Sequence, residues 1–250
     1  MPIGSIAVDE SRAATIGELT YRRIRADIVL GRLSPGRKLT LDRMRVMYGA
    51  SISTLRELFN RLASEGLLVA EGSRGFQVSS VSSANLREIA AMRQLLECQG
   101  MKESFTRGDI EWEGSVVAAH HKLEAFEKKM AGGEALAPET WRQYDWGFHL
   151  ALISACGSRV LIDIYTAICD KYLRYQMIAA TFRGQIAADE HRMLLEYALE
   201  RDWRSAQATL VEHIEDCVNQ MVNTLDAKPR RLDARQPADG SDRTGAKHAR

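Results

Sequence analysis

Four side chains that can bind a metal ion lie in helix-like segments of the chain. Asp145 and His149 are four residues apart in YDWGFH, so they share one helix face about 6 Å apart along the axis. His191 and His213 are 22 residues apart, with a helix break between them near Asp202. In an antiparallel hairpin they would face each other at similar height. One carboxylate and three imidazoles, with open positions left, suit Zn²⁺ first, and Ni²⁺ or Mn²⁺ as alternatives.

The segment that carries these residues has helical periodicity from 84 to 225, with no β-like stretch. Glycine, proline and aspartate interrupt it, and we expect six helices, over 84–106, 110–131, 138–155, 158–181, 186–200 and 203–225. Antiparallel helices joined by short loops pack as a bundle. The sequence therefore predicts a mainly α-helical protein whose C-terminal domain, residues 84–225, is an antiparallel all-α bundle.

The first eighty residues change from a helical to an extended pattern. Apolar spacing and glycine stops predict three helices, over 16–30, 40–48 and 51–63. Two short extended runs follow, at 67–70 and 77–78, with a glycine-containing turn at 71–75. Three helices followed by a two-stranded wing predict a winged helix-turn-helix over residues 15–80.

Flanking segments and charge complete the predicted organisation. Residues 1–14 and 226–250 lack apolar periodicity and are expected to be disordered, and a polar linker at 79–83 separates the two domains.

Residues 1–80 carry 12 Lys and Arg against 8 Asp and Glu, whereas residues 81–225 carry 15 against 21. A basic front beside an acidic body indicates a polyanionic partner for the front alone.

The third expected helix carries side chains suited to reading DNA. In a helix-turn-helix this helix enters the major groove, where Arg pairs with guanine, and Ser and Thr contact phosphates or base edges. Its core-facing residues are Leu55, Leu58, Phe59 and Leu62. Its outward residues are Ser51, Ser53, Thr54 and Arg56. Arg43 and Arg45 on the preceding helix and Arg74 at the tip of the wing extend the cationic surface.

Composition argues against a secreted or membrane protein. The four cysteines are widely spaced and form no CxxC motif, which fits reduced thiols in the cytosol. No apolar run approaches the roughly 18–20 residues needed to span a bilayer, and the N-terminus lacks the pattern of a signal peptide. We therefore expect a cytoplasmic protein without membrane contact.

Three runs of the N-terminal segment resemble the winged helix of the GntR superfamily: PGRKL (35–39), YGASISTLRELFNRLASEGLL (48–68) and GSRGFQV (72–78). The matching positions are Pro35, Gly36, Leu39, Gly49, Ser51, Arg56, Glu57, Leu62, Glu65, Gly66 and Gly75. The resemblance covers about sixty residues and implies binding to operator DNA. Ile52 and Thr54 stand where the family usually has Arg and Pro, so the family's operator sequence does not carry over.

The segment over 84–222 resembles the FCD ligand-binding domain of the FadR group of this superfamily, through the runs YDWGFH, DEHRMLLEYALERD and LVEHI. In metal-binding members an Asp-x-x-x-His pair and two later His are the ligands, which implies Asp145, His149, His191 and His213 here. Residues 107–127 and the run ISACGS (153–158) look closest to the CsiR-like branch, which controls the catabolism of small dicarboxylates related to glutarate.

The resemblance also implies residues that bind an effector. Arg93 matches an Arg that faces the family's pocket, although a salt bridge with Glu97, four residues on, is an equal alternative. Arg174 and Tyr175 are further candidates, while Gln176 stands where the family often has another Arg. The adjacent His120 and His121 point about 100° apart around a helix and are interpreted as surface residues.

These patterns predict a homodimeric, ligand-switched transcriptional repressor that binds an inverted-repeat operator and senses a small carboxylate, plausibly a dicarboxylate, through a divalent metal. A regulator with the ion itself as effector is one alternative. A metal-dependent hydrolase is another, since free coordination positions can activate water. It is disfavoured because no general base stands at a fixed spacing from the ligands, and because it leaves the winged helix unexplained.

Overall fold

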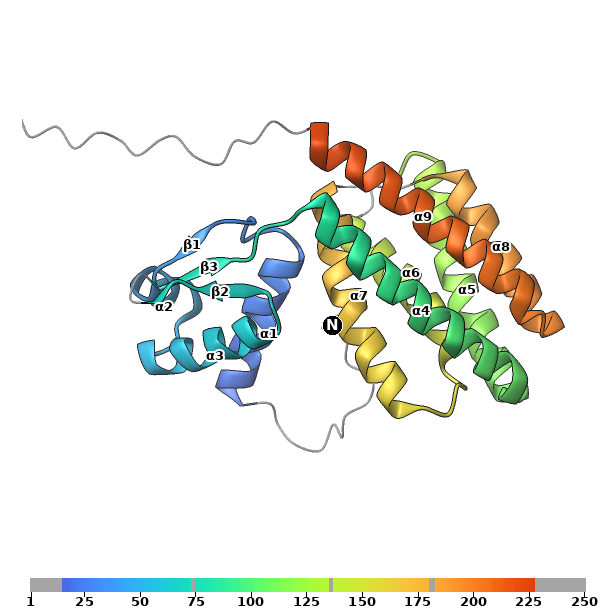
Figure 1. Ribbon diagram of the computed structural model, residues 1–250, viewed down its shortest axis with the longest axis horizontal. Helices are drawn as coiled ribbons and strands as arrows, with labels where there is room; N and C mark the ends of the chain where they lie inside the picture. Colours follow the sequence, from blue (N-terminus) through green and yellow to red (C-terminus); the bar gives the residue numbers. More distant parts are fainter. Residues whose placement is uncertain (1–14, 73–74, 135–136, 180–182, 228–250) are drawn as a thin grey trace, which may run out of the picture.

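The computed structural model describes residues 15–72, 75–134, 137–179 and 183–227, which form two helical units joined by one extended segment (Figure 1). The N-terminal unit is a winged helix-turn-helix, made of α1 (Ile16–Val29), β1 (Lys38–Leu39), α2 (Leu41–Tyr48), α3 (Ile52–Ser64), β2 (Leu68–Ala70) and β3 (Phe76–Val78). The C-terminal unit is all helical, with α4 (Ser83–Arg107), α5 (Ile110–Ala131), α6 (Pro138–Ile153), α7 (Arg159–Ala179), α8 (Gln185–Glu200) and α9 (Trp203–Ala227). The mainly α-helical fold is confirmed.

Helix boundaries follow local capping chemistry. The hydroxyl of Ser51 accepts a hydrogen bond from the Thr54 backbone N–H and starts α3, and Ser82 does the same at the start of α4. Gly49 ends α2 in a left-handed conformation, with φ of 68°, which a residue with a Cβ adopts only at a cost. Within the described residues, the expected helices differ from the observed ones by at most about three residues at either end.

The wing is a three-stranded antiparallel sheet with the order β1-β3-β2, whereas the sequence predicted two strands. Lys38 pairs with Gln77, and Leu39 pairs with Phe76. The strand β1 is only two residues long, so it offers no alternation of apolar and polar side chains to detect. Its pairing with β3 fixes the turn after α1 against the wing.

The C-terminal bundle surrounds one core. Helix α4 packs on α6, α7 and α9, while α8 packs between α5 and α9. Phe148 and Tyr165 are fully buried at the centre of this core. None of the helices in the described ranges is long and apolar enough to cross a membrane. The arrangement brings α6, α8 and α9 together, and these are the helices that carry the four candidate metal ligands.

Helix α7 belongs to both units. Its Leu173 is buried in the core of the winged helix-turn-helix rather than in that of the bundle. Beside it, Asp170 forms a salt bridge with Arg25 of α1, with an oxygen–nitrogen distance of 2.5 Å, and the same Arg25 reaches Glu65 at the end of α3. The two units are therefore in direct contact.

Three predictions fall on residues outside the described ranges. They are disorder of residues 1–14, disorder of the tail, and the role of Arg74 at the tip of the wing. The predicted start of the tail at 226 needs one correction, because α9 continues through Asp226 and ends at Ala227.

Candidate functional site

The four residues selected for metal chemistry form one buried cluster. Asp145 and His149 come from α6, His191 from α8 and His213 from α9, and one ligand atom of each lies within 4.8 Å of all the others. All four side chains are buried. The Asp145 carboxylate oxygen is 3.3 Å from Nε2 of His191 and 3.8 Å from Nε2 of His149. The four residues that the spacing argument grouped therefore lie together in the fold.

Each imidazole of the cluster is held by a carboxylate on the side away from its neighbours. Nδ1 of His149 is 2.5 Å from Glu97, Nδ1 of His191 is 2.8 Å from Glu127, and Nδ1 of His213 is 2.6 Å from Glu190. A carboxylate at Nδ1 fixes the orientation and tautomer of the ring and leaves Nε2 as the coordinating atom. This carboxylate–histidine pairing is typical of histidines that bind metals.

Two of the remaining imidazole nitrogen atoms make no hydrogen bond with a described residue. Nε2 of His149 and Nε2 of His191 are buried and make no hydrogen bond within the described part of the chain. A buried polar atom without a partner costs free energy, so such atoms are rare in folded proteins. A divalent ion bound by the Nε2 atoms and the Asp145 carboxylate would satisfy them. The donor set therefore fits a metal ion.

The charges of the cluster are strongly coupled. Burial alone would lower the pKa of His191, but the adjacent carboxylates of Asp145 and Glu127 outweigh burial and raise this pKa to about 9. Burial would raise the pKa of Asp145, but the His191 hydrogen bond and the neighbouring imidazoles hold it far below its usual value. Burial and the neighbouring histidines lower the pKa of His213. A metal ion that binds Nε2 of His191 would compete with a proton at this atom.

Buried arginines surround the cluster. Arg93 on α4 forms the salt bridge with Glu97 at 3.0 Å, and its guanidinium lies over the ring of Tyr172. Arg142 on α6 is buried near Asp145 and contributes to the depressed pKa of that carboxyl. Arg183 lies 3.1 Å from Nδ1 of His213. The salt bridge predicted for Arg93 is present, and the same residue is close enough to lower the pKa of the metal-site histidine His213.

Two interpretations from the sequence need correction. Arg174 and Tyr175 were expected beside the effector, but they contact the linker: Arg174 donates to the Ser79 carbonyl, and the Tyr175 hydroxyl accepts from the Ser82 N–H. Tyr172, two residues before Arg174 on α7, is the residue of this segment whose ring contacts Arg93. His120 was expected at the surface, but it is 7% exposed and packs edge-on against a core phenylalanine ring.

Sequence reasoning missed the carboxylates behind the histidines and two of the arginines. Glu190 is next to His191 in the chain, yet it pairs with His213, and only the packing of α8 on α9 brings them together. Glu127 lies on α5, 64 residues before its partner. Glu97 had a sequence signal, its spacing of four from Arg93, but this spacing gave no indication of His149.

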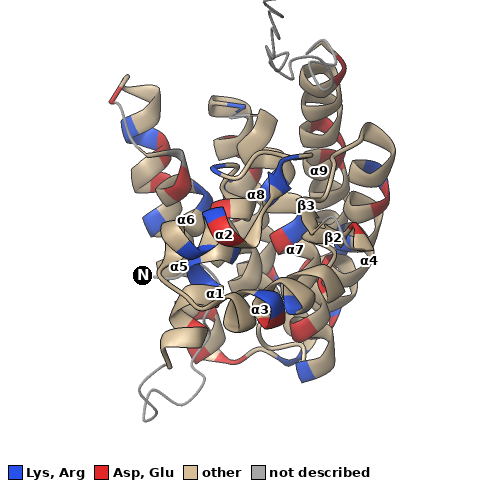
Figure 2. Cartoon of the chain, turned by 90° about the vertical axis from the view of Figure 1, so that its left-hand side faces the viewer, with Lys and Arg blue, Asp and Glu red and all other residues tan. Residues whose placement is uncertain are grey.

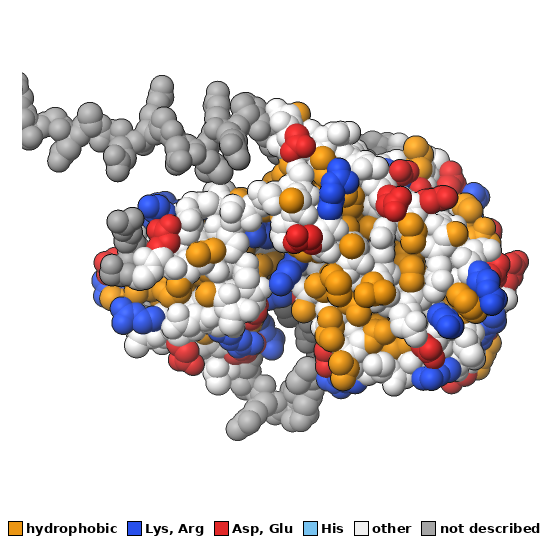
Figure 3. Space-filling view, viewed as in Figure 1, with side chains coloured by type: hydrophobic (Ala, Val, Ile, Leu, Met, Phe, Trp, Pro, Cys, Tyr) orange, Lys and Arg blue, Asp and Glu red, His pale blue; other side chains and the backbone are white. Residues whose placement is uncertain are grey.

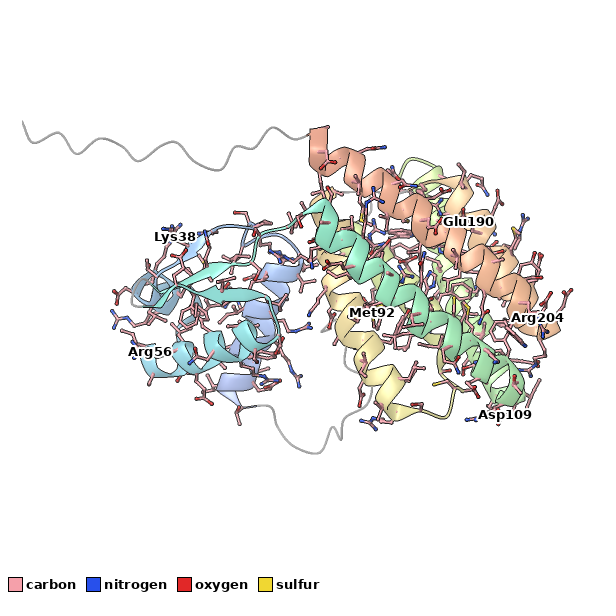
Figure 4. All side chains as sticks on the ribbon, viewed as in Figure 1. Lys38, Arg56, Met92, Asp109, Glu190 and Arg204 are labelled. Atoms are coloured by element: carbon pink, nitrogen blue, oxygen red, sulfur yellow. The ribbon has the colours of Figure 1, made fainter. Side chains whose placement is uncertain are left out.

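The second candidate site is the outer face of the winged helix-turn-helix. Arg56 projects from α3 at the end of the molecule away from the bundle (Figure 4), and Arg43 and Arg45 are exposed on α2. None of these three guanidinium groups has a carboxylate partner among the described residues. Lys and Arg on α1, α2 and α3 are interspersed with acidic residues on this face (Figure 2).

The start of α3 is pre-ordered by its own hydroxyl groups. The Ser51 hydroxyl lies 2.8 Å from that of Ser53 and 2.9 Å from that of Thr54, while it caps the helix. Ser51 therefore has a structural role in addition to any contact with DNA. Ile52, which departs from the family pattern, is partly exposed beside them and can contact a thymine methyl group.

Comparisons with known proteins agree with this architecture. Residues 17–78 match the bacterial regulatory proteins of the gntR family, and residues 88–216 match the FCD domain. The HTH-type transcriptional regulator BphR of Paraburkholderia xenovorans is 33% identical over 204 residues, which cover 81% of this chain and 83% of that protein. The HTH-type transcriptional repressor RspR of Escherichia coli is 34% identical over 80% of this chain and 86% of its own length. The repressor GlaR of the same species is 28% identical over 78% of this chain and 90% of its own length.

Solved structures have the same fold. Escherichia coli McbR/YncC superposes with a TM-score of 0.70 at 16% identity and covers 85% of this chain and 100% of its own. A GntR transcriptional regulator from Rhodococcus sp. RHA1 superposes with a TM-score of 0.67 at 19% sequence identity, and the match covers 83% of this chain and 97% of that one. The FCD match alone spans more than half of the chain. The chain therefore belongs to the GntR family of transcriptional regulators, carries an FCD domain, and is a DNA-binding regulator rather than an enzyme.

Proposed function

We propose that this regulator is a repressor that binds an inverted-repeat operator as a homodimer and responds to a small carboxylate bound at a divalent metal in its FCD domain. The observation that carries the proposal is the Asp145, His149, His191 and His213 cluster with its unpartnered Nε2 atoms. Its place of action is the cytoplasm, where operator DNA is found. Zn²⁺ is the first choice of metal, with Ni²⁺ or Mn²⁺ as alternatives, because three imidazoles and one carboxylate suit all three ions.

The carboxylate effector is supported by the charges around the cluster. Three histidines and one aspartate leave positions open on an ion that takes five or six ligands. Arg93 and Arg142 are buried close to the cluster, and a guanidinium pairs with a carboxylate through two parallel hydrogen bonds. A dicarboxylate could use one end on the metal and the other on a guanidinium. This agrees with the resemblance to the CsiR-like branch.

The effector proposal predicts a metal-dependent affinity. We expect a C4–C6 dicarboxylate to bind the metal-loaded protein at least about tenfold more tightly than the metal-stripped protein, since one lost charge-assisted contact costs about 1.5–3 kcal/mol. Arg93→Lys keeps the positive charge beside Glu97 but removes the planar fork, so it should weaken the same ligand. Calorimetric titration of both forms measures this. Equal affinities in the stripped and loaded protein would contradict the proposal.

The carboxylates behind the histidines give a second prediction. Glu127→Gln keeps the shape of the side chain but removes the charge that orients His191, and we expect metal affinity to fall about 10–100-fold. The matched control is Glu124→Gln, one helix turn earlier on α5, where the side chain is exposed and pairs with Lys128. Competition with a chelator measures both affinities. Equal metal affinity in the two variants would contradict a role for Glu127 at the metal site.

An exposed apolar surface supports the homodimer. Helices α4 and α7 pack against each other, and both carry exposed apolar side chains: Leu95 (63%) and Met92 (42%) on α4, and Val160 (68%) and Ile164 (47%) on α7. Apolar side chains gather over these two helices (Figure 3), and Met92 projects from α4 on this side (Figure 4). Large exposed apolar patches mark interaction surfaces. A two-fold operator requires a two-fold dimer, so a second copy is the occupant that we propose.

Charge placed in this surface should prevent dimerisation. We expect Leu95→Glu to sediment as a monomer at concentrations where the wild-type chain is a dimer, because an unpaired charge would be buried in the interface. The matched control is Leu199→Glu, since Leu199 on α8 is also an exposed leucine, at 44%. Sedimentation velocity measures both. A dimeric Leu95→Glu protein would place the interface elsewhere.

A second candidate function is sensing of the metal itself. It is favoured by the burial of all four ligands, since a closed site needs no further ligand to be stable. In that case the metal alone would change operator affinity, and carboxylates would have no effect. Operator binding measured with and without metal, in the absence of organic anions, separates the two.

A further inference from the structure

A second concave site lies where the two domains meet, and none of the four cluster residues lines it. The cleft has a volume of about 320 Å³, within the range of small-molecule sites. One wall comes from the winged helix-turn-helix and the linker, through Leu67 and Ser79. The other wall comes from α4 and α7, through Ile168, Lys171 and Arg174. A ligand in this cleft would therefore contact both domains.

The cleft contains a buried cation without a negative partner. Arg174 is 5% exposed, and its one hydrogen-bond acceptor in the described ranges is the neutral carbonyl of Ser79. Its Nε is buried and has no partner there. Burial lowers the pKa of this guanidinium, and no nearby carboxylate offsets the effect. Buried charges are normally paired, because leaving one unpaired costs several kcal/mol.

Lys171 adds a second positive charge. Lys171 lies about one turn before Arg174 on α7 and lines the same cleft. It forms no salt bridge with a described residue. Glu88 is the acidic residue of the lining, and it accepts a hydrogen bond from Asn85 at 3.4 Å. The cations therefore outnumber the carboxylate by two to one in the cleft.

Part of the remaining lining is apolar, alongside the polar residues Ser80 and Asn85. Leu67, Ile89, Met92 and Ile168 contribute hydrocarbon surface to the cleft. Such a surface excludes water and strengthens a charge interaction beside it. Two cations beside hydrocarbon surface match an anion with a small apolar body better than inorganic phosphate or a sugar.

We propose that the interdomain cleft binds a small organic anion with one negative group and an apolar body, held by Arg174 and Lys171. The bound anion would contact the linker on one side and α7 on the other. It would thereby hold the winged helix-turn-helix in a fixed position against the bundle. Because α7 also carries Tyr172, which contacts Arg93, occupation of the cleft is positioned to influence the metal-site effector as well.

A sulfonate is the probe that tests this site, because sulfonates pair with guanidinium groups but are weak ligands for divalent metals. Benzenesulfonate titrated into the full-length, metal-loaded protein should bind once per chain, followed by NMR or calorimetry. Methyl phenyl sulfone, which has the same ring and no charge, should bind at least about tenfold more weakly. Arg174→Met should weaken benzenesulfonate at least about tenfold, as expected for loss of a charge-assisted hydrogen bond.

Two further variants keep this test decisive. Lys171→Met removes the cation that has no structural partner, so it should weaken the probe severalfold without lowering the melting temperature. Arg159→Met, at an exposed position on the same helix, should leave binding within about twofold of wild type. Metal content measured for every variant separates a failure of the metal site from a failure of this one. Non-saturable binding to the wild type, or wild-type affinity for benzenesulfonate in both Arg174→Met and Lys171→Met, would overturn the proposal.

Discussion

The double variant His191→Ala/His213→Ala is expected to be purified with far less than one metal ion per chain. It removes two of three imidazoles, and the remaining Asp145 and His149 form only a bidentate site on one helix. Affinity for a divalent ion should then collapse, because every ligand lost removes a metal bond. Elemental analysis of the purified protein measures the stoichiometry.

The same variant should lose the stability that the metal supplies. An ion present at 100 times its dissociation constant stabilises the folded state by about 2.7 kcal/mol, which corresponds to roughly 5–10 °C in melting temperature for a protein of this size. The alanines also leave Glu127 and Glu190 without their partners. The change in melting temperature on adding a chelator therefore isolates the contribution of the metal. We expect this change to be large in wild type and absent in the variant.

His121→Ala is the matched control for this experiment. His121 is exposed on α5 and lies outside the cluster, so metal content and the chelator-induced shift should both equal those of wild type. A double variant that retained one metal per chain would show that the ion lies elsewhere, and the proposed metal site would be wrong.

The second large effect is expected at the DNA-reading face. Arg56→Ala should abolish the operator footprint at protein concentrations that saturate it with wild type, because each bidentate arginine–guanine contact contributes about 1–3 kcal/mol and a two-fold dimer would lose two of them. Arg56 is exposed and forms no salt bridge with a described residue, so the fold should be unaffected. Circular dichroism and a footprinting titration measure the two properties.

Arg43→Ala distinguishes base reading from backbone contact. A lost phosphate contact should reduce the slope of log K against log salt concentration by about 0.9. It should weaken binding to all DNA sequences by a similar factor. Arg159→Ala, in the C-terminal domain, is the control and should match wild type. A normal footprint from Arg56→Ala would show that α3 does not read the operator in the expected way.

The helices were predictable from the sequence because their signals are local. Apolar periodicity over more than a dozen residues and capping residues such as Ser51 and Ser82 mark helices without reference to the rest of the chain. Strand β1 was missed because it is a strand only through its pairing with β3, about 40 residues later. Local information fixes the elements, whereas pairing across the fold does not appear in it.

The four residues of the buried cluster could be grouped from the sequence for a similar reason, but the carboxylates behind the histidines could not. Asp145 and His149 share one helix turn, and a two-helix hairpin relates His191 to His213, so simple geometry brings them together. Glu127 requires the packing of α5 on α8, which no spacing encodes. Arg174 was misplaced because it lies two positions after Tyr172, a turn of about 200° around the helix, so Tyr172 contacts Arg93 whereas Arg174 contacts the linker.

The account depends most directly on coupling between the metal site and DNA. Operator affinity should be measured by fluorescence anisotropy while a C4–C6 dicarboxylate is titrated into metal-loaded and metal-stripped wild-type protein. A ligand that favours one dimer geometry should weaken operator binding by roughly 5- to 150-fold, the range of typical allosteric couplings, in the metal-loaded protein alone. An operator affinity that stays constant in the loaded protein across the whole panel, or that falls equally in the stripped protein, would contradict a metal-dependent carboxylate switch.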